Sequence, residues 1–119
     1  MPGGVCISCT RRAISADEFA RHRQAHRAGV EWLDAAQIRG PLVCRPLRAD
    51  DMFWPLGAAC RRGAAEFLKK QSLPAHERGQ AFCVCDDLGI VYVSPLRIDA
   101  RVRVTPATTE IIELGLARS

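Results

Sequence analysis

Apolar runs long enough to cross a lipid bilayer are missing from this sequence of 119 residues. No segment approaches the roughly 20 apolar residues that a membrane-spanning helix needs. The first residues, Met1-Pro2-Gly3-Gly4, also lack the charged and then apolar pattern of a secretion signal. Aromatic residues are also few, at 6%. Neither glycine nor serine forms a tract, and this excludes low-complexity disorder. We therefore expect a soluble, cytoplasmic protein that does not bind a membrane.

Motifs for catalysis and nucleotide binding are missing as well. Neither of the glycine-rich loops that cradle phosphates, G-x-x-x-x-G-K-[ST] and G-x-G-x-x-G, is present. His76 is the only histidine outside the N-terminal segment, and it follows Pro74 in a predicted turn. The adjacent acids Asp50-Asp51 and Asp86-Asp87 are expected to cap turns, because neighbouring side chains diverge. The sequence therefore assigns no catalytic residue and no cofactor to this chain.

What the sequence does contain is typical of a folded domain. Apolar residues make up 48% and charged residues 25%, and a chain of this length can bury roughly two-thirds of its unfolded surface. The core thus needs no disulfide, and the six cysteines are expected to be reduced thiols. Cys83 and Cys85 alternate in an apolar run, which predicts that both pack on one face of a strand.

The charge balance is mildly basic, with 17 Lys+Arg against 13 Asp+Glu and a formal net charge of +4. Fifteen of the basic residues are arginine, whose flat guanidinium binds phosphate and carboxylate in a bidentate manner. An arginine-rich genome produces the same bias without any function. The positions of the arginines, rather than their number, must therefore indicate what they bind.

Periodicity predicts short strands and two helices. The predicted strands cover residues 5–14, 42–45, 82–85, 90–93, 96–104 and 108–114, and the predicted helices cover 15–28 and 63–71. Asp86-Asp87-Leu88-Gly89 is expected to close a hairpin. In the strand 96–104 the residues Arg97, Asp99, Arg101 and Arg103 would form a charged outer face.

These elements predict a compact α+β domain. We place it at residues 30–115, with a strand and helix at 1–29 that are part of it or appended to it, and a tail at 116–119. Residues 46–57 are expected to be a loop whose apolar side chains, Met52, Phe53, Trp54 and Leu56, pack against the domain.

Residues 1–29 allow a second interpretation. Cys6, Cys9, His22 and His26 follow the spacing C-x2-C-x12-H-x3-H of a zinc finger that binds nucleic acid. However, Ala13 stands where such a finger has a core aromatic residue, and no aromatic residue precedes Cys6. We therefore expect a strand and a solvated helix without metal, and keep the zinc finger as a minor alternative.

From Val30 onward the sequence contains an ordered series of short matches to a known family. The matching residues are Trp32-Leu33-Asp34-Ala35, Gly40-Pro41-Leu42-Val43 with Arg45, Asp51 and Phe53, Pro55-Leu56-Gly57, Glu66-Phe67-Leu68, Leu73-Pro74, Glu77-Arg78, Ile90-Val91-Tyr92-Val93, and Leu96-Arg97-Ile98-Asp99 with Arg101 to Thr105. With these residues the chain resembles the C-terminal domain of tRNA(Ile)-lysidine synthetase (TilS), over roughly 75 of its 119 residues. It departs from the family at Ala49-Asp50-Asp51, Gly63 and Pro95, where Pro-Gly-Asp, lysine and glycine are usual.

The resemblance implies a fold and a role. The family's C-terminal domain is similar to a module of phenylalanyl-tRNA synthetase and holds the tRNA body, near the acceptor stem. The ligase reaction, which attaches lysine to an anticodon cytidine, takes place on a separate N-terminal domain that uses ATP and Mg²⁺. Its Ser-Gly-Gly-x-Asp-Ser loop is absent here. The implied partners are tRNA and that catalytic domain, and the chain itself is expected neither to consume ATP nor to modify tRNA.

Candidate RNA contacts are the basic residues around the predicted helix 63–71, on the predicted strand 96–104 and in the loops between. They are Arg45, Arg48, Arg61, Arg62, Lys69, Lys70, Arg78, Arg97, Arg101 and Arg103. Arg61 and Arg62 precede the helix, where free backbone N–H groups would help them to bind one phosphate. The alternative is a protein-docking module that does not touch RNA, favoured if an apolar patch forms around Phe53 and Trp54.

Overall fold

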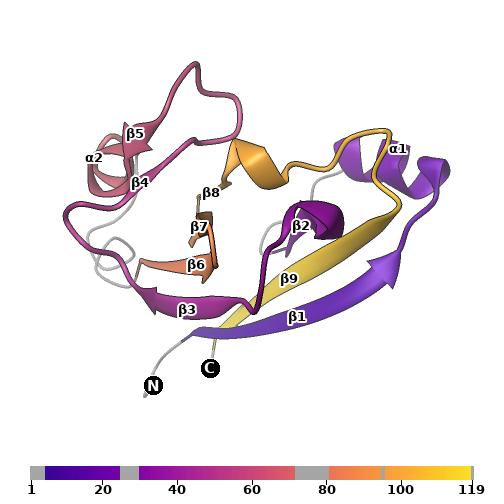
Figure 1. Ribbon diagram of the computed structural model, residues 1–119, viewed down its shortest axis with the longest axis horizontal. Coiled ribbons are helices and arrows are strands. Elements are labelled where there is room, and N and C mark those ends of the chain that lie inside the picture. The colour runs from indigo at the N-terminus through magenta and orange to yellow at the C-terminus, as the bar shows by residue number, and fades with distance from the viewer. Residues whose placement is uncertain (1–4, 25–29, 72–80, 95, 119) are drawn as a thin grey trace. The chain divides into compact units, whose positions relative to one another are not determined.

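The structure is a computed structural model that describes residues 5–24, 30–71, 81–94 and 96–118, and Figure 1 shows the elements they form. The chain divides into two compact units. Unit 1 combines both ends of the chain, Met1–Ile38 and Val102–Ser119, whereas unit 2 is the continuous segment Arg39–Arg101. Antiparallel strands and short helices make up both units. The predicted α+β class is therefore confirmed.

The sheet of unit 1 is built around the last strand of the chain. Its elements are β1 (Val5–Ala13), α1 (Ala16–Gln24), β2 (Val30–Asp34), the short helix η1 (Ala35–Gln37) and β9 (Glu110–Arg118). The strand order is β1-β9-β2, and both neighbours run antiparallel to β9. The side chains of Leu33 on β2 and of Ile111 and Leu114 on β9 are fully buried. The predicted strands at 5–14 and 108–114 are thus confirmed, and the second extends further than expected.

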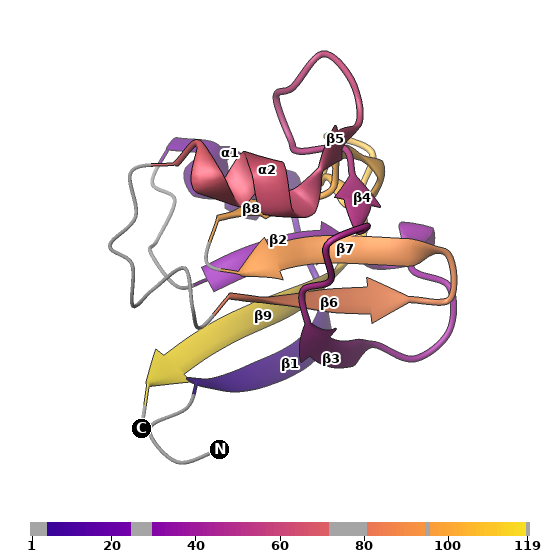
Figure 2. The same ribbon diagram turned by 90° about the vertical axis from the view of Figure 1, so that its left-hand side faces the viewer.

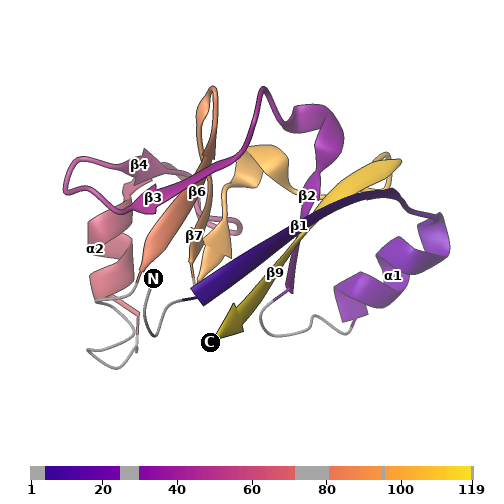
Figure 3. The same ribbon diagram turned by 90° about the horizontal axis from the view of Figure 1, so that it is seen from below.

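The start of α1 follows from two side chains. Ser15 Oγ accepts a hydrogen bond from the N–H of Glu18, and Glu18 Oε1 accepts one from the N–H of Ser15. This reciprocal pairing satisfies two backbone donors that the first turn of a helix leaves free. Figure 3 shows α1 following the end of β1. The predicted continuation to Ala28 lies outside the described residues.

Unit 2 has a four-stranded sheet with a small second sheet and one helix. Its elements are β3 (Val43–Pro46), β4 (Met52–Phe53), β5 (Arg62–Gly63), α2 (Ala64–Lys69), β6 (Phe82–Asp86), β7 (Gly89–Ser94) and β8 (Arg97–Ile98). The order is β3-β6-β7-β8, and β4 pairs with β5. Figure 2 shows the β6–β7 hairpin, with α2 and the β4–β5 pair along one side of it. Phe53, Ala64, Cys83, Ile90 and Val93 form the core between them.

The hairpin and the cysteine pair agree with the sequence predictions. Asp86 pairs with Gly89, and Asp86 Oδ1 accepts hydrogen bonds from the N–H groups of Leu88 and Gly89. Gly89 has φ +143°, which side-chain-bearing residues rarely adopt. Cys83 and Cys85 lie on one face of β6, with their sulfur atoms 3.7 Å apart, and Cys83 is fully buried.

The predicted strand over residues 96–104 is wrong. Only Arg97–Ile98 form a strand, and the chain then turns into the short helix η2 (Ala100–Val102). The cause is Asp99, whose carboxylate accepts hydrogen bonds from the N–H groups of Trp54 and Arg101, both at 2.8 Å. Such side-chain hydrogen bonds compete with a strand ladder. The charged face expected for Arg97, Arg101 and Arg103 therefore does not form.

The loop at residues 46–57 is packed only in part. Phe53 is 1% exposed, but Met52, Trp54 and Leu56 are 47%, 41% and 37% exposed. Within this segment Met52 and Phe53 form β4, whose partner strand holds Phe53 against the core. Packing of this loop was thus predicted correctly for Phe53 and wrongly for its three apolar neighbours.

The domain boundaries at residues 29 and 115 stay a prediction, and strands from both ends of the chain pair in unit 1. β1 pairs with β9 from Val5↔Arg118 to Ala13↔Glu110, so residues 5–13 and 110–118 share one sheet. The segment 30–115 contributes its first and last parts to unit 1 and its middle to unit 2. None of the helices in the described residues has both the length and the apolar character to cross a membrane.

Candidate nucleic-acid interface

Four of the candidate RNA contacts lie at the two ends of α2. Arg61 and Arg62 precede the helix, and Arg62 belongs to β5, where it is paired with Phe53. Lys69 ends the helix and Lys70 is its C-cap. All four residues are exposed. The sequence therefore placed these cations correctly around one short helix.

At the N-terminus of α2, the first N–H group of the predicted phosphate site already has a partner. The N–H of Ala64, the first residue of the helix, donates to the carbonyl oxygen of Asp51 at 2.8 Å. The helix also has only six residues, so its dipole is small. Arg61 and Arg62 thus present exposed charges next to a helix whose first N–H is already bonded.

Arg45 is held by a buried acid. Its Nη1 and Nη2 donate to the two carboxylate oxygens of Asp51 at 2.9 and 2.8 Å, and the N–H of Arg48 donates to the same carboxylate at 2.6 Å. These hydrogen bonds, led by those from Arg45, lower the pKa of Asp51, although burial opposes the shift. The charge of Arg45 is balanced within unit 2, whereas the side chain of Arg48 is exposed.

Arg101 is held in the same manner at the other end of the sheet. Its Nη2 and Nη1 donate to the carboxylate of Asp86 at 2.9 and 3.2 Å, and the N–H of Arg39 donates to Asp86 Oδ2 at 2.9 Å. Burial raises the pKa of Asp86, but the hydrogen bonds from Arg101, Arg39 and Leu88 outweigh it and lower the pKa overall. Asp86 therefore joins the first and the last residue of unit 2, and both acidic pairs singled out in the sequence contribute a turn-capping carboxylate, as predicted.

Arg97 lies against a tight turn. Its Nη1 donates to the carbonyl oxygen of Leu56 at 2.9 Å, and its guanidinium carbon lies 5.9 Å from the centre of the Phe67 ring. A carbonyl and an aromatic face leave the positive charge uncompensated, and the residue is exposed. Arg97 is thus an oriented cation on the surface of unit 2.

The two remaining candidates lie outside the described residues of unit 2. Arg103 is an exposed residue of unit 1 that follows η2. Arg78 lies outside the described residues. Of the ten candidates, unit 2 therefore brings together Arg48, Arg61, Arg62, Lys69, Lys70 and Arg97 as exposed cations, with Arg45 and Arg101 in ion pairs.

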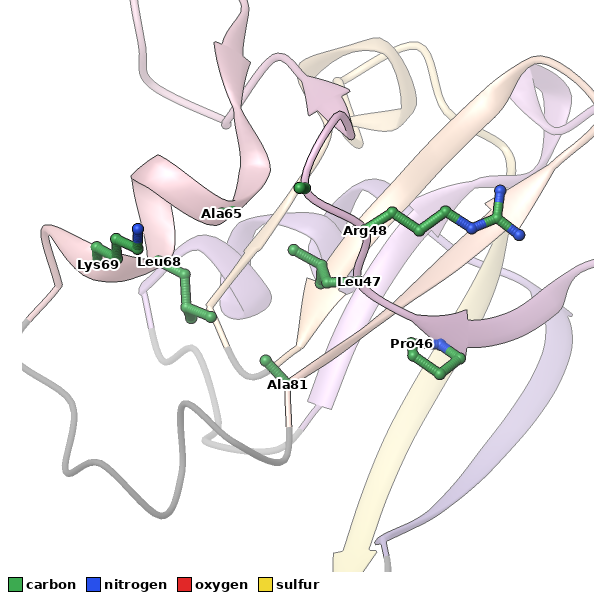
Figure 4. Close-up of a pocket in the computed structure, with 8 residues that line it drawn as sticks. Pro46, Leu47, Arg48, Ala65, Leu68, Lys69 and Ala81 are labelled. Carbon is green, nitrogen blue, oxygen red and sulfur yellow. The ribbon is translucent and has the colours of Figure 1, made fainter.

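A shallow hollow lies between α2 and the segment that follows β3 (Figure 4). Leu47, Leu68 and Ala81 face the hollow, while Arg48 and Lys69 lie at its edge. Its lining is mostly apolar and contains no cysteine, serine, acid or histidine among the described residues. The hollow is bordered by two of the candidate RNA contacts.

Trp54 has a structural role that was not predicted from the sequence. Residues Pro55–Ala58 form a turn in which the N–H of Ala58 donates to the carbonyl of Pro55 at 2.9 Å and Gly57 has φ +90°. Trp54 Nε1 donates to the carbonyl oxygen of Ala58 at 2.8 Å. The sequence Pro55-Leu56-Gly57 could have indicated this turn, because glycine is typical at the third residue of a turn where φ is positive. Trp54 was interpreted from the sequence as a packed loop residue or as part of an apolar docking patch, and not as a residue that closes a turn.

The zinc interpretation involves residues that are described only in part. The side chains of Cys6 and His26 lie outside the described residues, and Cys9 is exposed. The ring of His22 stacks on Trp32 with 3.9 Å between the centroids and an angle of 4°. In the described part of the chain no group of three metal-binding side chains comes together.

Sequence comparison finds no family model that matches this chain, and no curated protein matches it either. Structure comparison does find similar folds. A crystal structure of the TILS C-terminal domain has a TM-score of 0.75 and 20% sequence identity, and the match covers 98% of this chain and 86% of that one. The resemblance seen in the sequence is therefore confirmed at the level of the fold.

A second similar structure is an N-terminal fragment of the phenylalanyl-tRNA synthetase β-subunit from Pyrococcus horikoshii. It has a TM-score of 0.69 and 16% identity, and the match covers 95% of this chain but only 39% of that fragment. This chain thus has the fold of one module within the larger fragment. At these identities the comparisons establish the fold alone.

Proposed function

We propose that this chain is a tRNA-binding module that holds the tRNA body for a separate ATP-dependent domain, which ligates lysine to the anticodon cytidine. The observation that carries the proposal is the fold match over 98% of the chain to the TILS C-terminal domain. The second similar structure also comes from a protein that is named for its action on tRNA. Two such matches favour RNA as the ligand.

The exposed cations of unit 2 would supply the contacts. Arg48, Arg61, Arg62, Lys69, Lys70 and Arg97 are available to bind phosphate oxygens, whereas Arg45 and Arg101 hold the unit together. Double-stranded RNA is recognised mostly by its shape, its phosphates and its 2′-hydroxyls, so a set of cations on a rigid surface is sufficient. The module would position the RNA without reading much of its sequence.

In this proposal, catalysis takes place on a separate domain. ATP, Mg²⁺ and the ligase step are assigned to the catalytic domain that the sequence resemblance implies as a partner. The described residues of this chain would contribute binding alone, and the cytoplasm is the compartment in which that reaction partner and tRNA meet.

Docking on another protein is the second candidate function. The exposed apolar side chains of Met52, Trp54 and Leu56 favour it, because such a group on a small domain often marks a protein contact. In that case the cations would serve solubility, and the chain would associate with its partner without RNA.

Salt dependence distinguishes the two candidates. The experiment titrates fluorescently labelled tRNA with the purified chain at several salt concentrations between about 50 and 200 mM. A phosphate-binding module is expected to lose affinity along a straight line of log K against log salt, with a slope set by the number of phosphates that are bound. Absence of tRNA binding by the folded protein at the lowest salt would favour docking on a protein instead.

A further inference from the structure

One tight turn of unit 2 presents an indole and a guanidinium together. The turn Pro55–Ala58 offers two carbonyl oxygens: that of Ala58 accepts from Trp54 Nε1 at 2.8 Å, and that of Leu56 accepts from Arg97 Nη1 at 2.9 Å. Both donors keep exposed surface, since Trp54 is 41% exposed and Arg97 is also exposed. An aromatic face and a cation are thereby fixed to the same four residues.

The indole is unusually restricted for an exposed side chain. Besides the ring hydrogen bond, the N–H of Trp54 donates to Asp99 Oδ2 at 2.8 Å, and its carbonyl accepts from the N–H of Ala100 at 2.7 Å. Leu56 N–H donates to the carbonyl of Ile98 at 3.0 Å, which ties the turn to β8. A ring that is already ordered loses little conformational entropy when a ligand stacks on it.

The surroundings of this turn are basic. Arg61 and Arg62 follow it in the chain, before β5 ends and α2 begins, and both are exposed. The guanidinium carbon of Arg97 also lies over the ring of Phe67, 5.9 Å from its centre. Asp99, an acidic side chain that contacts this segment, is 9% exposed, and its carboxylate accepts hydrogen bonds from the N–H groups of Trp54 and Arg101. An anionic ligand with a flat apolar part fits this combination.

We propose that Trp54 and Arg97 form a subsite for an unpaired nucleotide of RNA, in which the base stacks on the indole and an adjoining phosphate binds the guanidinium. The nucleotide must be unpaired, because bases inside a duplex are already stacked and do not expose their faces. Stacking on an aromatic side chain tolerates every base, so the subsite accepts RNA ends or loops of any sequence. This inference rests on the proposed function and adds a single-stranded contact to the phosphate contacts of the module.

Tryptophan fluorescence tests the subsite directly. The probes are a ten-nucleotide oligoadenylate and a blunt-ended RNA duplex. Trp32 is 9% exposed and its Nε1 donates to Glu113, so a change in fluorescence on adding RNA reports mainly on Trp54. We expect the oligoadenylate to quench the emission and to protect Trp54 from acrylamide, and the duplex to do neither.

Variants assign the effect to the ring. Trp54→Ala is expected to weaken oligoadenylate binding about ten-fold, as is typical for removal of one stacked base, and to leave duplex binding unchanged. Trp54→Phe keeps a ring and should retain most of the affinity while losing the quenching. Met52→Ala, which removes a neighbouring exposed apolar side chain, is the matched control and should bind both probes as the wild type does.

The possible outcomes separate this inference from the proposed function. Wild-type protein that binds the duplex and the oligoadenylate without quenching would overturn the subsite and leave the tRNA-binding module intact. Equal losses of oligoadenylate affinity in the Trp54→Ala and Met52→Ala variants would do the same. Wild-type protein that binds neither probe nor tRNA would overturn both. If the Trp54→Ala variant does not fold, quenching of the wild type and the Trp54→Phe variant decide the question.

Discussion

The guanidinium of Arg45 donates to both carboxylate oxygens of Asp51, and this one acid connects β3, the loop at Arg48 and α2. Its side chain holds Arg45 of β3 and the N–H of Arg48, and its backbone carbonyl accepts the first N–H of α2. Asp51 therefore fixes the position of the helix that carries the exposed cations. A residue that was singled out only as a turn cap is central to the structure of the candidate interface.

Replacing this acid should destabilise the protein. We expect Asp51→Asn to lower the free energy of unfolding by about 2 kcal/mol, because Arg45 loses its charged acceptor while its side chain is 24% exposed. Urea unfolding followed by circular dichroism measures the change. Asp50→Asn, at the exposed neighbouring position, should stay within about 0.5 kcal/mol of the wild type. Equal losses in the two variants would contradict the assigned role.

Acid should unfold the protein through the same carboxylates. The pKa values of Asp51 and Asp86 are lowered in the folded state, so folding favours their deprotonated forms. Their contribution is fully present above the unfolded-state pKa of about 4 and is lost as the pH falls below it. The melting temperature is therefore expected to fall steeply below about pH 4, and less steeply in Asp51→Asn. A wild-type melting temperature that stays constant down to about pH 2.5 would disprove this dependence.

Removing the two arginines before α2 should weaken tRNA binding. The double variant Arg61→Ala, Arg62→Ala is expected to lower both the affinity and the salt slope, by about one unit for each phosphate that is no longer bound. Unrelated tRNAs should be affected alike, because phosphate contacts carry no sequence information. Arg11→Ala in unit 1, whose guanidinium is paired with Glu110 at 2.8 Å, is the control for removal of an exposed charge. Unchanged affinity and slope in the double variant would remove Arg61 and Arg62 from the interface.

The thiols should differ widely in reactivity. Burial, together with the neighbouring thiol of Cys85, raises the pKa of Cys83 to about 12, so it forms almost no thiolate at neutral pH. We expect N-ethylmaleimide to modify the exposed Cys60 quickly and Cys83 only after denaturation. Peptide mass spectrometry over a time course gives both rates. Similar rates for the two cysteines in the folded protein would show that β6 is not buried in solution.

Metal should not be needed for folding. The core of unit 1 contains Leu33, Ile111 and Leu114, and the stacking of His22 on Trp32 places that ring against an apolar surface. The purified protein is therefore expected to contain less than stoichiometric zinc, and its melting temperature should not change when a chelator is added. Elemental analysis and a thermal melt provide the two measurements. One zinc per chain together with a lower melting temperature on chelation would establish the zinc finger instead.

Local features were predictable from the sequence, and long-range ones were not. The β6–β7 hairpin follows from its turn residues, and the start of α1 follows from Ser15 and Glu18, because each depends on residues a few positions apart. The pairing of β1 with β9 joins residues such as Cys9 and Leu114. Nothing in either strand specifies its partner, so the sequence indicated the strands but not the sheet.

The same limit explains why the ion pairs of Arg45 and Arg101 were not predicted. Arg45 and Arg101 were expected to bind RNA because arginine in a loop or on a strand face is usually exposed. Their partners, Asp51 and Asp86, lie 6 and 15 positions away and reach them only after the chain has folded. In contrast, Arg61, Arg62, Lys69 and Lys70 were placed correctly, since their positions depend on one short helix.

The central position of β9 also determines when unit 1 can be completed as the chain is made. β1 and β2 both bind to β9, which is synthesised after all of unit 2. The continuous segment Arg39–Arg101 can therefore fold on the ribosome while β1 and β2 still lack the strand between them. Until Glu110–Arg118 emerges, the first strands carry unpaired backbone edges that can bind to other chains. Misassociation during synthesis should accordingly begin at the N-terminal strands, and unit 1 should form last.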